Sequence, residues 1–139
     1  MVIEKSDFGK FQVGYKDSFT REVTQSTVDS FVDVSGDVNP IHVNEEYAKT
    51  TRFKKRIAHG VISASFISSL VGLKMPGIGA IYVSQTLKFR APVFIGDTLT
   101  VTGEVVERDE ERKRIKIQTD VTNQDGVLVT TGHAVMMHE

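Results

Sequence analysis

The chain has 139 residues with 17 lysines and arginines against 18 acidic residues, so its net charge of −1 gives no basic footprint for general nucleic-acid binding. Its length suits a single domain over residues 1–139, and the absence of cysteine excludes disulfides, thiolate zinc sites and thiol nucleophiles. Because neither a secretory signal nor a membrane-spanning apolar run is visible, we expect a cytoplasmic protein that does not bind membranes.

The first part of the chain predicts short helices joined by loops. Weak alternation over residues 19–23 indicates a short strand. Thr24 is a suitable N-cap for a helix that follows, and Gly36 would end that helix. We expect a loop over residues 37–42 and a second short helix that begins at Asn44.

Residues 61–73 contain no charged side chain. A surface helix would show one polar, charged face, whereas this segment is apolar or small all round. The pattern therefore predicts a helix that is buried on all sides, and such a helix needs other elements to wrap around it.

The second half of the chain predicts the elements that would wrap this helix. Alternating segments rich in Val, Ile and Thr predict four strands, at residues 81–90, 98–107, 112–123 and 127–138. Short turns join the last three strands, so they should be antiparallel neighbours. Helices followed by antiparallel strands indicate an α+β fold.

Residues 35–42 bring an acid, an amide and an imidazole together around a proline. Asp37 and His42 can hold one water between them, with the carboxylate as base and the imidazole as donor or second anchor. Asn39, which precedes the proline, can fix the turn by bonding to the backbone. The same pattern also fits a surface loop in which Asp37 only caps a turn.

Gly60 directly precedes the uncharged segment. A glycine lets a ligand approach the backbone closely, and the free amides at a helix N-terminus suit an oxyanion. A thioester carbonyl bound there would be polarised as negative charge develops on its oxygen. Alternatively, Gly60 only makes a tight start to the helix.

Together these features resemble the hydratase-2 motif of MaoC-like proteins. The residues that carry the resemblance are Ser35, Gly36, Asp37, Asn39, Pro40, Ile41, His42 and Asn44, then Ala48, Phe53, Ile57, Ala58, His59 and Gly60. The likeness continues from about Gly14 to the strand that contains Gly132, which is nearly the whole chain. It implies a hot-dog fold, an antiparallel β-sheet wrapped around a long central helix, with the chain as one MaoC-like domain.

The resemblance is closest to the short (R)-specific enoyl-CoA hydratases that feed polyhydroxyalkanoate synthesis. It implies reversible addition of water to trans-2-enoyl-CoA, an acyl-CoA substrate, no cofactor, and pairing into a homodimer or higher oligomer. One alternative is a β-hydroxyacyl-[acyl carrier protein] dehydratase of fatty acid metabolism. Others are a hot-dog thioesterase and a non-catalytic acyl-thioester binding module.

By the same resemblance Asp37 and His42 are the catalytic pair. Asp37 would activate water for attack on C3, and either His42 or the water network would return a proton to C2. Gly60 would bind the thioester oxygen, while Asn39 would orient the loop. Ser68, which matches a serine in the family, would hold Asp37 through a hydrogen bond or would only pack within its helix.

Two further features bear on ligands. The basic run of Arg52, Lys54, Lys55 and Arg56 can contact the phosphates of coenzyme A, or can simply be a solvated loop. Four scattered histidines without a clustered carboxylate predict no metal site. Of these, His59 borders Gly60 and suits a structural role that ties the loop, rather than proton transfer.

Overall fold

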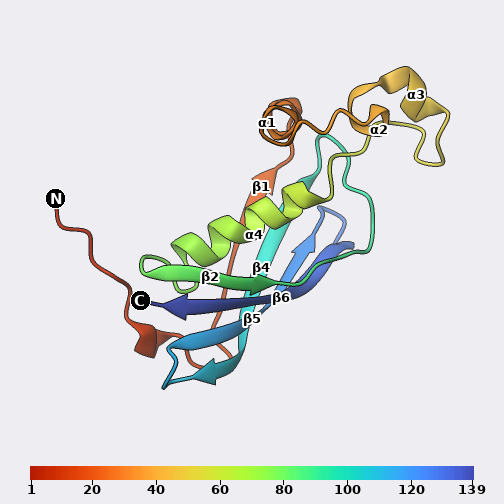
Figure 1. Ribbon diagram of the computed structural model, residues 1–139. Helices are drawn as coiled ribbons and strands as arrows, with labels where there is room; N and C mark the ends of the chain where they lie inside the picture. The colour runs from red at the N-terminus through yellow and green to blue at the C-terminus, as the bar shows by residue number, and fades with distance from the viewer.

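The computed structural model describes residues 1–139 and has one six-stranded antiparallel sheet with a long helix, α4, lying against it (Figure 1). The strands are β1 (Lys16–Glu22), β2 (Ala80–Gln85), β3 (Lys88–Phe89), β4 (Thr98–Asp109), β5 (Arg114–Thr122) and β6 (Leu128–His138). The helices are η1 (Phe8–Lys10), α1 (Gln25–Ser35), α2 (Pro40–Val43), α3 (Glu45–Lys49) and α4 (Val61–Leu73). None of these helices has the length and apolar character needed to cross a bilayer.

The sheet has the strand order β1-β4-β5-β6-β2, and the two-residue strand β3 also pairs with β6. Along β5 buried and partly exposed residues alternate strictly, so one face of the strand contributes to the core. The strands predicted from residues 98, 112 and 127 onward are confirmed as β4, β5 and β6, in antiparallel order.

The single strand predicted over residues 81–90 is wrong, because β2 and β3 are separate. The backbone crosses closely over Gly132 between them: the Thr86 N–H donates to the His133 carbonyl at 2.9 Å, and the His133 N–H donates to Thr86 Oγ1 at 2.9 Å. A side chain at Gly132 would overlap the Thr86 carbonyl. This close approach interrupts the strand without any signal in its own residues.

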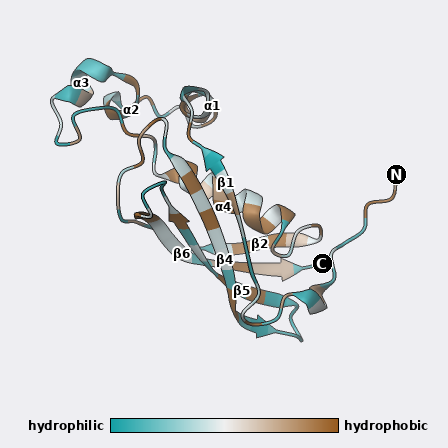
Figure 2. Cartoon of the chain, turned by 180° about the vertical axis from the view of Figure 1, so that it is seen from behind, coloured by the Kyte–Doolittle hydropathy of each residue, from teal (hydrophilic) through white to brown (hydrophobic).

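The helix α4 has the predicted bounds, but only one of its sides is buried. Ile62, Phe66, Ile67, Leu70 and Val71 enter the core, which also takes residues from all the long strands β4, β5 and β6. The opposite side is exposed along its length and carries mainly small and apolar residues, namely Val61, Ser65, Ser68, Ser69, Gly72 and Leu73. Burial on all sides is therefore wrong for a single chain, and Figure 2 shows the apolar character of this helix.

The helix α1 follows the local signals closely. Thr24 caps it, with its hydroxyl accepting from the Thr27 N–H while the Thr27 hydroxyl accepts from the Thr24 N–H. Gly36 ends the helix at φ 73°, a left-handed conformation that glycine adopts easily. The predicted strand before it is confirmed as β1.

The loop predicted over residues 37–42 is partly helical. Pro40 begins the one-turn helix α2, since proline suits the first position of a helix, and the Asn39 side chain caps it at 3.1 Å. Asn44 caps the predicted helix α3. The helices α1, α2 and α3 gather near the N-terminal end of α4, where they surround the residues of the motif (Figure 1).

Candidate active site

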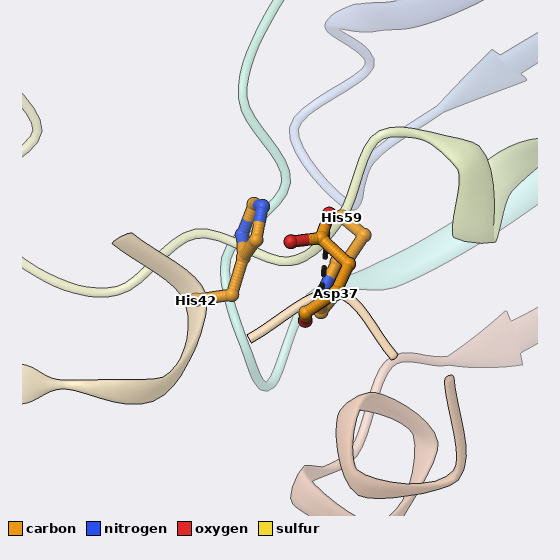
Figure 3. Close-up of side chains that lie close together, drawn as sticks. All are labelled: Asp37, His42 and His59. Atoms are coloured by element: carbon orange, nitrogen blue, oxygen red, sulfur yellow. Dashed lines mark hydrogen bonds and ion pairs between the residues drawn. The ribbon is translucent and has the colours of Figure 1, made fainter. Parts of the chain in front are cut away.

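Three side chains of the motif meet beside the N-terminus of α4: Asp37 before α2, His42 within α2, and His59 just before α4 (Figure 3). One ring nitrogen of each histidine and one carboxylate oxygen of Asp37 all lie within 4.8 Å of one another. The expectation that the histidines are scattered without a carboxylate partner is therefore wrong. Sequence spacing could not show this, because the chain returns to the same point after folding through α3.

Asp37 is held by its own loop. Its carboxylate Oδ1 accepts from the Asn39 N–H at 3.0 Å, and its backbone N–H donates to Ser35 Oγ at 3.1 Å. The side chain is 49% exposed, so a water can reach the carboxylate. Asn39 in turn caps α2, and these short-range bonds fix the direction of the carboxylate.

One ring nitrogen of His42 is hydrogen-bonded within the chain and the other is free. Its Nδ1 lies 2.7 Å from the carbonyl oxygen of Ile57, which can only accept, so Nδ1 carries the proton. In the neutral ring Nε2 then carries the lone pair, and it makes no hydrogen bond within the chain. This arrangement leaves Nε2 available to a water or to a substrate.

Gly60 lies at the N-terminus of α4, where neither its N–H nor that of Val61 has a hydrogen-bond partner. The Gly60 carbonyl accepts from the Ser63 hydroxyl at 2.7 Å, and Ser63 Oγ is 2.8 Å from Thr130 Oγ1. Unpaired N–H groups at the positive end of a 13-residue helix can polarise a carbonyl and stabilise negative charge on its oxygen.

A cleft of about 390 Å³ opens in front of these groups. His42 and Gly60 line it, together with the aromatic rings of Phe53 and Phe89 and, from the segment before β4, Pro92. Asp37 and His59 are not among the lining residues. The cleft therefore brings a ligand to the His42 ring and the helix N-terminus, with the Asp37 carboxylate just beyond.

The four cations of the basic run, Arg52, Lys54, Lys55 and Arg56, lie in different surroundings. Arg52 lines the cleft, whereas Lys54 is exposed. Lys55 lies over the Phe94 ring, with Nζ 4.4 Å from its centre. Arg56 binds Glu45 at 2.9 Å and Gln25 at 2.8 Å, so it joins α1 to α3.

Ser68 lies on the exposed side of α4 and makes no hydrogen bond to Asp37 within the chain. The serine that does bond near the site is Ser63, through Gly60 and Thr130. It lies three residues beyond Gly60, the spacing at which a helical hydroxyl reaches back to the carbonyl at the helix start.

Sequence reasoning missed Phe89 and Arg90, which line the cleft. The ring of Phe89 lies beside Gly60, where a Cβ would come within 3.0 Å of its Cδ1 atom. Both residues fall within the segment predicted as one strand, residues 81–90. The available signal in the sequence is an aromatic beside an arginine, just before Pro92.

The cluster of Asp37, His42 and His59 fits acid–base chemistry better than metal binding. A chelated metal needs imidazoles that aim their in-plane lone pairs at one point. The rings of His42 and His59 instead lie face to face, with centres 3.8 Å apart and planes 30° apart. His42 Nδ1 and His59 Nε2 are also both bonded to backbone carbonyls.

The chain is similar in sequence to known enzymes. The chain is 46% identical to an (R)-specific enoyl-CoA hydratase of Rhodospirillum rubrum over 94% of this chain and 90% of that protein. It is 43% identical to a 3-hydroxybutyryl-CoA dehydratase of Methylorubrum extorquens over 88% of this chain and 78% of that protein.

The structure is similar to that of an unliganded (R)-hydratase from Pseudomonas aeruginosa, with a TM-score of 0.91 and 40% identity over 96% of this chain and 86% of that one. This likeness confirms the predicted α+β hot-dog fold. The model of the MaoC-like domain family matches residues 10–127. The resemblance in the motif is thus confirmed over most of the sequence, and the chain belongs to the MaoC-like domain family.

Proposed function

We propose that this chain is an (R)-specific enoyl-CoA hydratase, which adds water reversibly to trans-2-enoyl-CoA and gives (R)-3-hydroxyacyl-CoA. The observation that carries the proposal is the meeting of the Asp37 carboxylate, the free Nε2 of His42 and the unpaired Gly60 N–H beside one cleft. The activities named for the relatives from Rhodospirillum rubrum and Methylorubrum extorquens are the two directions of such a reaction.

Each group has a role in the proposed reaction. The thioester oxygen accepts a hydrogen bond from the Gly60 N–H, which draws electron density away from C3. Asp37 takes a proton from the water that it shares with His42, and the water oxygen forms its bond to C3. The proton that left the water then reaches C2 of the resulting enolate, relayed through the lone-pair nitrogen Nε2 of His42 or through the water network, so that Asp37 is again a carboxylate and the substrate gains one water in total.

The carrier is proposed to be coenzyme A, with Arg52 as the contact to its phosphates. Of the four cations expected to serve this purpose, Arg52 is the one that lines the cleft, and Arg90 faces the same space. Lys54 and Lys55 are exposed nearby, whereas Arg56 is bound to Glu45 and Gln25. An acyl carrier protein would present the same thioester, so the two carriers must be compared directly.

We further propose that residues 1–139 form one domain and that two copies pair through β2 and the exposed side of α4. One buried core includes residues from Phe8 to Met136, which supports a single domain. The strand β2 is at the edge of the sheet and exposes Ile81, Tyr82 and Val83 by 39–43%. Because an exposed apolar edge strand is a template for pairing, a second copy would cover it. A cytoplasmic location stays a prediction.

The decisive experiment follows crotonyl-CoA with the purified protein. Loss of the conjugated enoyl thioester absorbance without release of free CoA supports a hydratase, whereas CoA release supports a thioesterase. If neither absorbance loss nor CoA release is observed, the result supports a non-catalytic binding module. In the reverse direction, (R)-3-hydroxybutyryl-CoA should be dehydrated and the (S) isomer should not. A higher kcat/KM for crotonyl-[acyl carrier protein] than for crotonyl-CoA would favour the dehydratase of fatty acid synthesis.

Asp37→Asn and His42→Ala test the catalytic pair. Each should lower kcat by about 10²-fold or more, as expected for general acid–base groups. Asparagine keeps an oxygen that can accept from the Asn39 N–H, so the loop should survive. Asp33→Asn is a matched control, because Asp33 is exposed on α1 and should leave the rate unchanged. Near-normal activity in Asp37→Asn would refute the mechanism.

A further inference from the structure

His59 lies behind the catalytic pair, outside the cleft. Its side chain is only 2% exposed, and it is not among the residues that line the space for a ligand. Figure 3 shows its ring next to the Asp37 side chain, with the His42 ring nearby. His59 therefore cannot touch the substrate, and any influence on the reaction must pass through its neighbours.

The imidazole of His59 contacts both members of the pair. Its Nε2 lies 2.9 Å from the Asp37 carbonyl oxygen, so Nε2 carries the proton and donates it. The same nitrogen is 3.9 Å from Asp37 Oδ2. On its flat face the ring stacks against His42, with centres 3.8 Å apart, while Phe31 packs against it at 4.7 Å.

The backbone of His59 fixes the third group of the site. Its carbonyl oxygen accepts from the Ile62 N–H at 3.0 Å, which sets the plane of the peptide that carries the Gly60 N–H. One residue thus holds the Asp37 loop by a hydrogen bond, the His42 ring by stacking, and the Gly60 amide through the shared peptide.

The other ring nitrogen of His59 indicates why packing alone is a poor explanation. Nδ1 is buried and has no hydrogen-bond partner. A buried polar atom without a partner is unfavourable, and a phenyl ring would fill the same space without it. The benefit of an imidazole here lies in the hydrogen bond that Nε2 makes.

We propose that His59 is a positioning residue, which sets the separation of the Asp37 carboxylate and the His42 ring so that both reach one water. This inference rests on the proposed function, since it presupposes that the pair catalyses hydration. His59 itself transfers no proton to the substrate.

Two variants separate the two contacts. His59→Phe keeps a ring that can stack on His42 but loses the donor, whereas His59→Gln keeps a donor of similar reach but loses the stacking. Each should lower kcat for crotonyl-CoA by about tenfold or more while KM stays within about threefold, because the contacts act on the reacting groups and not on substrate binding. His133→Phe, a ring change on β6 without side-chain hydrogen bonds, should leave both constants unchanged.

A double variant gives the readout that a purely structural role would not move. If His59 acts by positioning Asp37, then adding His59→Phe to Asp37→Asn should lower kcat by less than about twofold further. A general loss of structure would instead multiply the two effects. Thermal unfolding checks that each variant is folded, and His59→Gln serves if His59→Phe fails to fold.

Three results would overturn the positioning role: unchanged kcat in both variants, a rise in KM alone, or full multiplication of effects in the double variant. Failure of the proposed function is distinguishable from these, because the wild-type protein would then show no hydration of crotonyl-CoA.

Discussion

Gly60→Ala is a sharp test of the helix N-terminus because it adds a single methyl group beside the proposed oxyanion site. At φ −55° and ψ −36° the backbone already suits alanine, so no conformational strain arises. The new Cβ would lie 3.0 Å from Cδ1 and 3.2 Å from Cε1 of Phe89. The perturbation is therefore one contact with one side chain.

The effect on folding should be small. To restore an ordinary carbon–carbon separation of about 3.5 Å the Phe89 ring must retreat by about 0.5 Å. Phe89 is 54% exposed and can turn outward, at roughly 0.5–1.5 kcal/mol for a displaced rotamer. Alanine in place of Gly60 lowers the conformational entropy of the unfolded chain, which stabilises the folded state by about 0.4–1 kcal/mol. The free energy of unfolding should change by less than about 1 kcal/mol, and Tm by less than roughly 5 °C.

The effect on the reaction should be large. Gly60→Ala keeps the N–H that is proposed to hold the thioester oxygen but places a methyl group beside it, which blocks the approach of that oxygen. Loss of one such hydrogen bond lowers kcat by about 10²–10³-fold. We expect a kcat for crotonyl-CoA about 10²-fold lower in Gly60→Ala. Wild-type activity together with a normal Tm would refute the assignment of the oxyanion site to Gly60.

Phe89→Ala separates the two ways in which the methyl group can act. If activity returns in the double variant Gly60→Ala/Phe89→Ala, the loss came from a ring displaced into the cleft. If it does not return, the methyl group itself blocks the carbonyl, as the oxyanion role requires. Phe89→Ala alone provides the baseline for this comparison.

Arg56→Lys removes the guanidinium fork that binds Glu45 and Gln25, so the free energy of unfolding in urea should fall by about 1–2 kcal/mol with KM for crotonyl-CoA unchanged. Arg52→Ala should do the reverse, with a higher KM and the same stability, and equal effects on KM would contradict this division. Gly132→Ala would press a methyl group into the Thr86 carbonyl, so we expect a loss of about 3 kcal/mol, and an unchanged urea midpoint would disprove the close crossing. Burial raises the pKa of Tyr82 to about 12 from 10.0, so the unfolded chain releases this proton first and stability should fall between pH 10 and 12. Tyr82→Phe should flatten that fall, as measured by urea unfolding at stepped pH; an equal fall in the variant would assign it to other groups.

The elements that could be predicted from the sequence are those with local causes. Thr24 and Gly36 bound α1 because a cap and a left-handed turn act within a few residues. The strands β4, β5 and β6 follow from alternation, since each has one face in the core. The resemblance in the motif likewise depends on residues close together in the chain.

What could not be predicted depends on distant contacts. The break between β2 and β3 comes from the crossing over Gly132, and nothing within residues 81–90 signals it. In the basic run, Arg52 reaches the cleft and Arg56 does not, because α1 and α3 supply partners for Arg56. The bounds predicted for the uncharged helix α4 are confirmed, whereas its predicted burial on all sides is wrong, since a single chain covers only one side of it.

The segment 57–60 explains how such distant parts become one site. Its Ile57 carbonyl accepts from His42 Nδ1–H at 2.7 Å, and the Ala58 N–H donates to the Val93 carbonyl at 2.7 Å. The His59 side chain donates to the Asp37 carbonyl, and Gly60 provides the unpaired N–H. The acid, the imidazole and the oxyanion donor are thus all positioned by one short stretch of backbone. This stretch is itself hydrogen-bonded to the segment before β4. Because the support is shared, a shift of this segment would displace all three groups together.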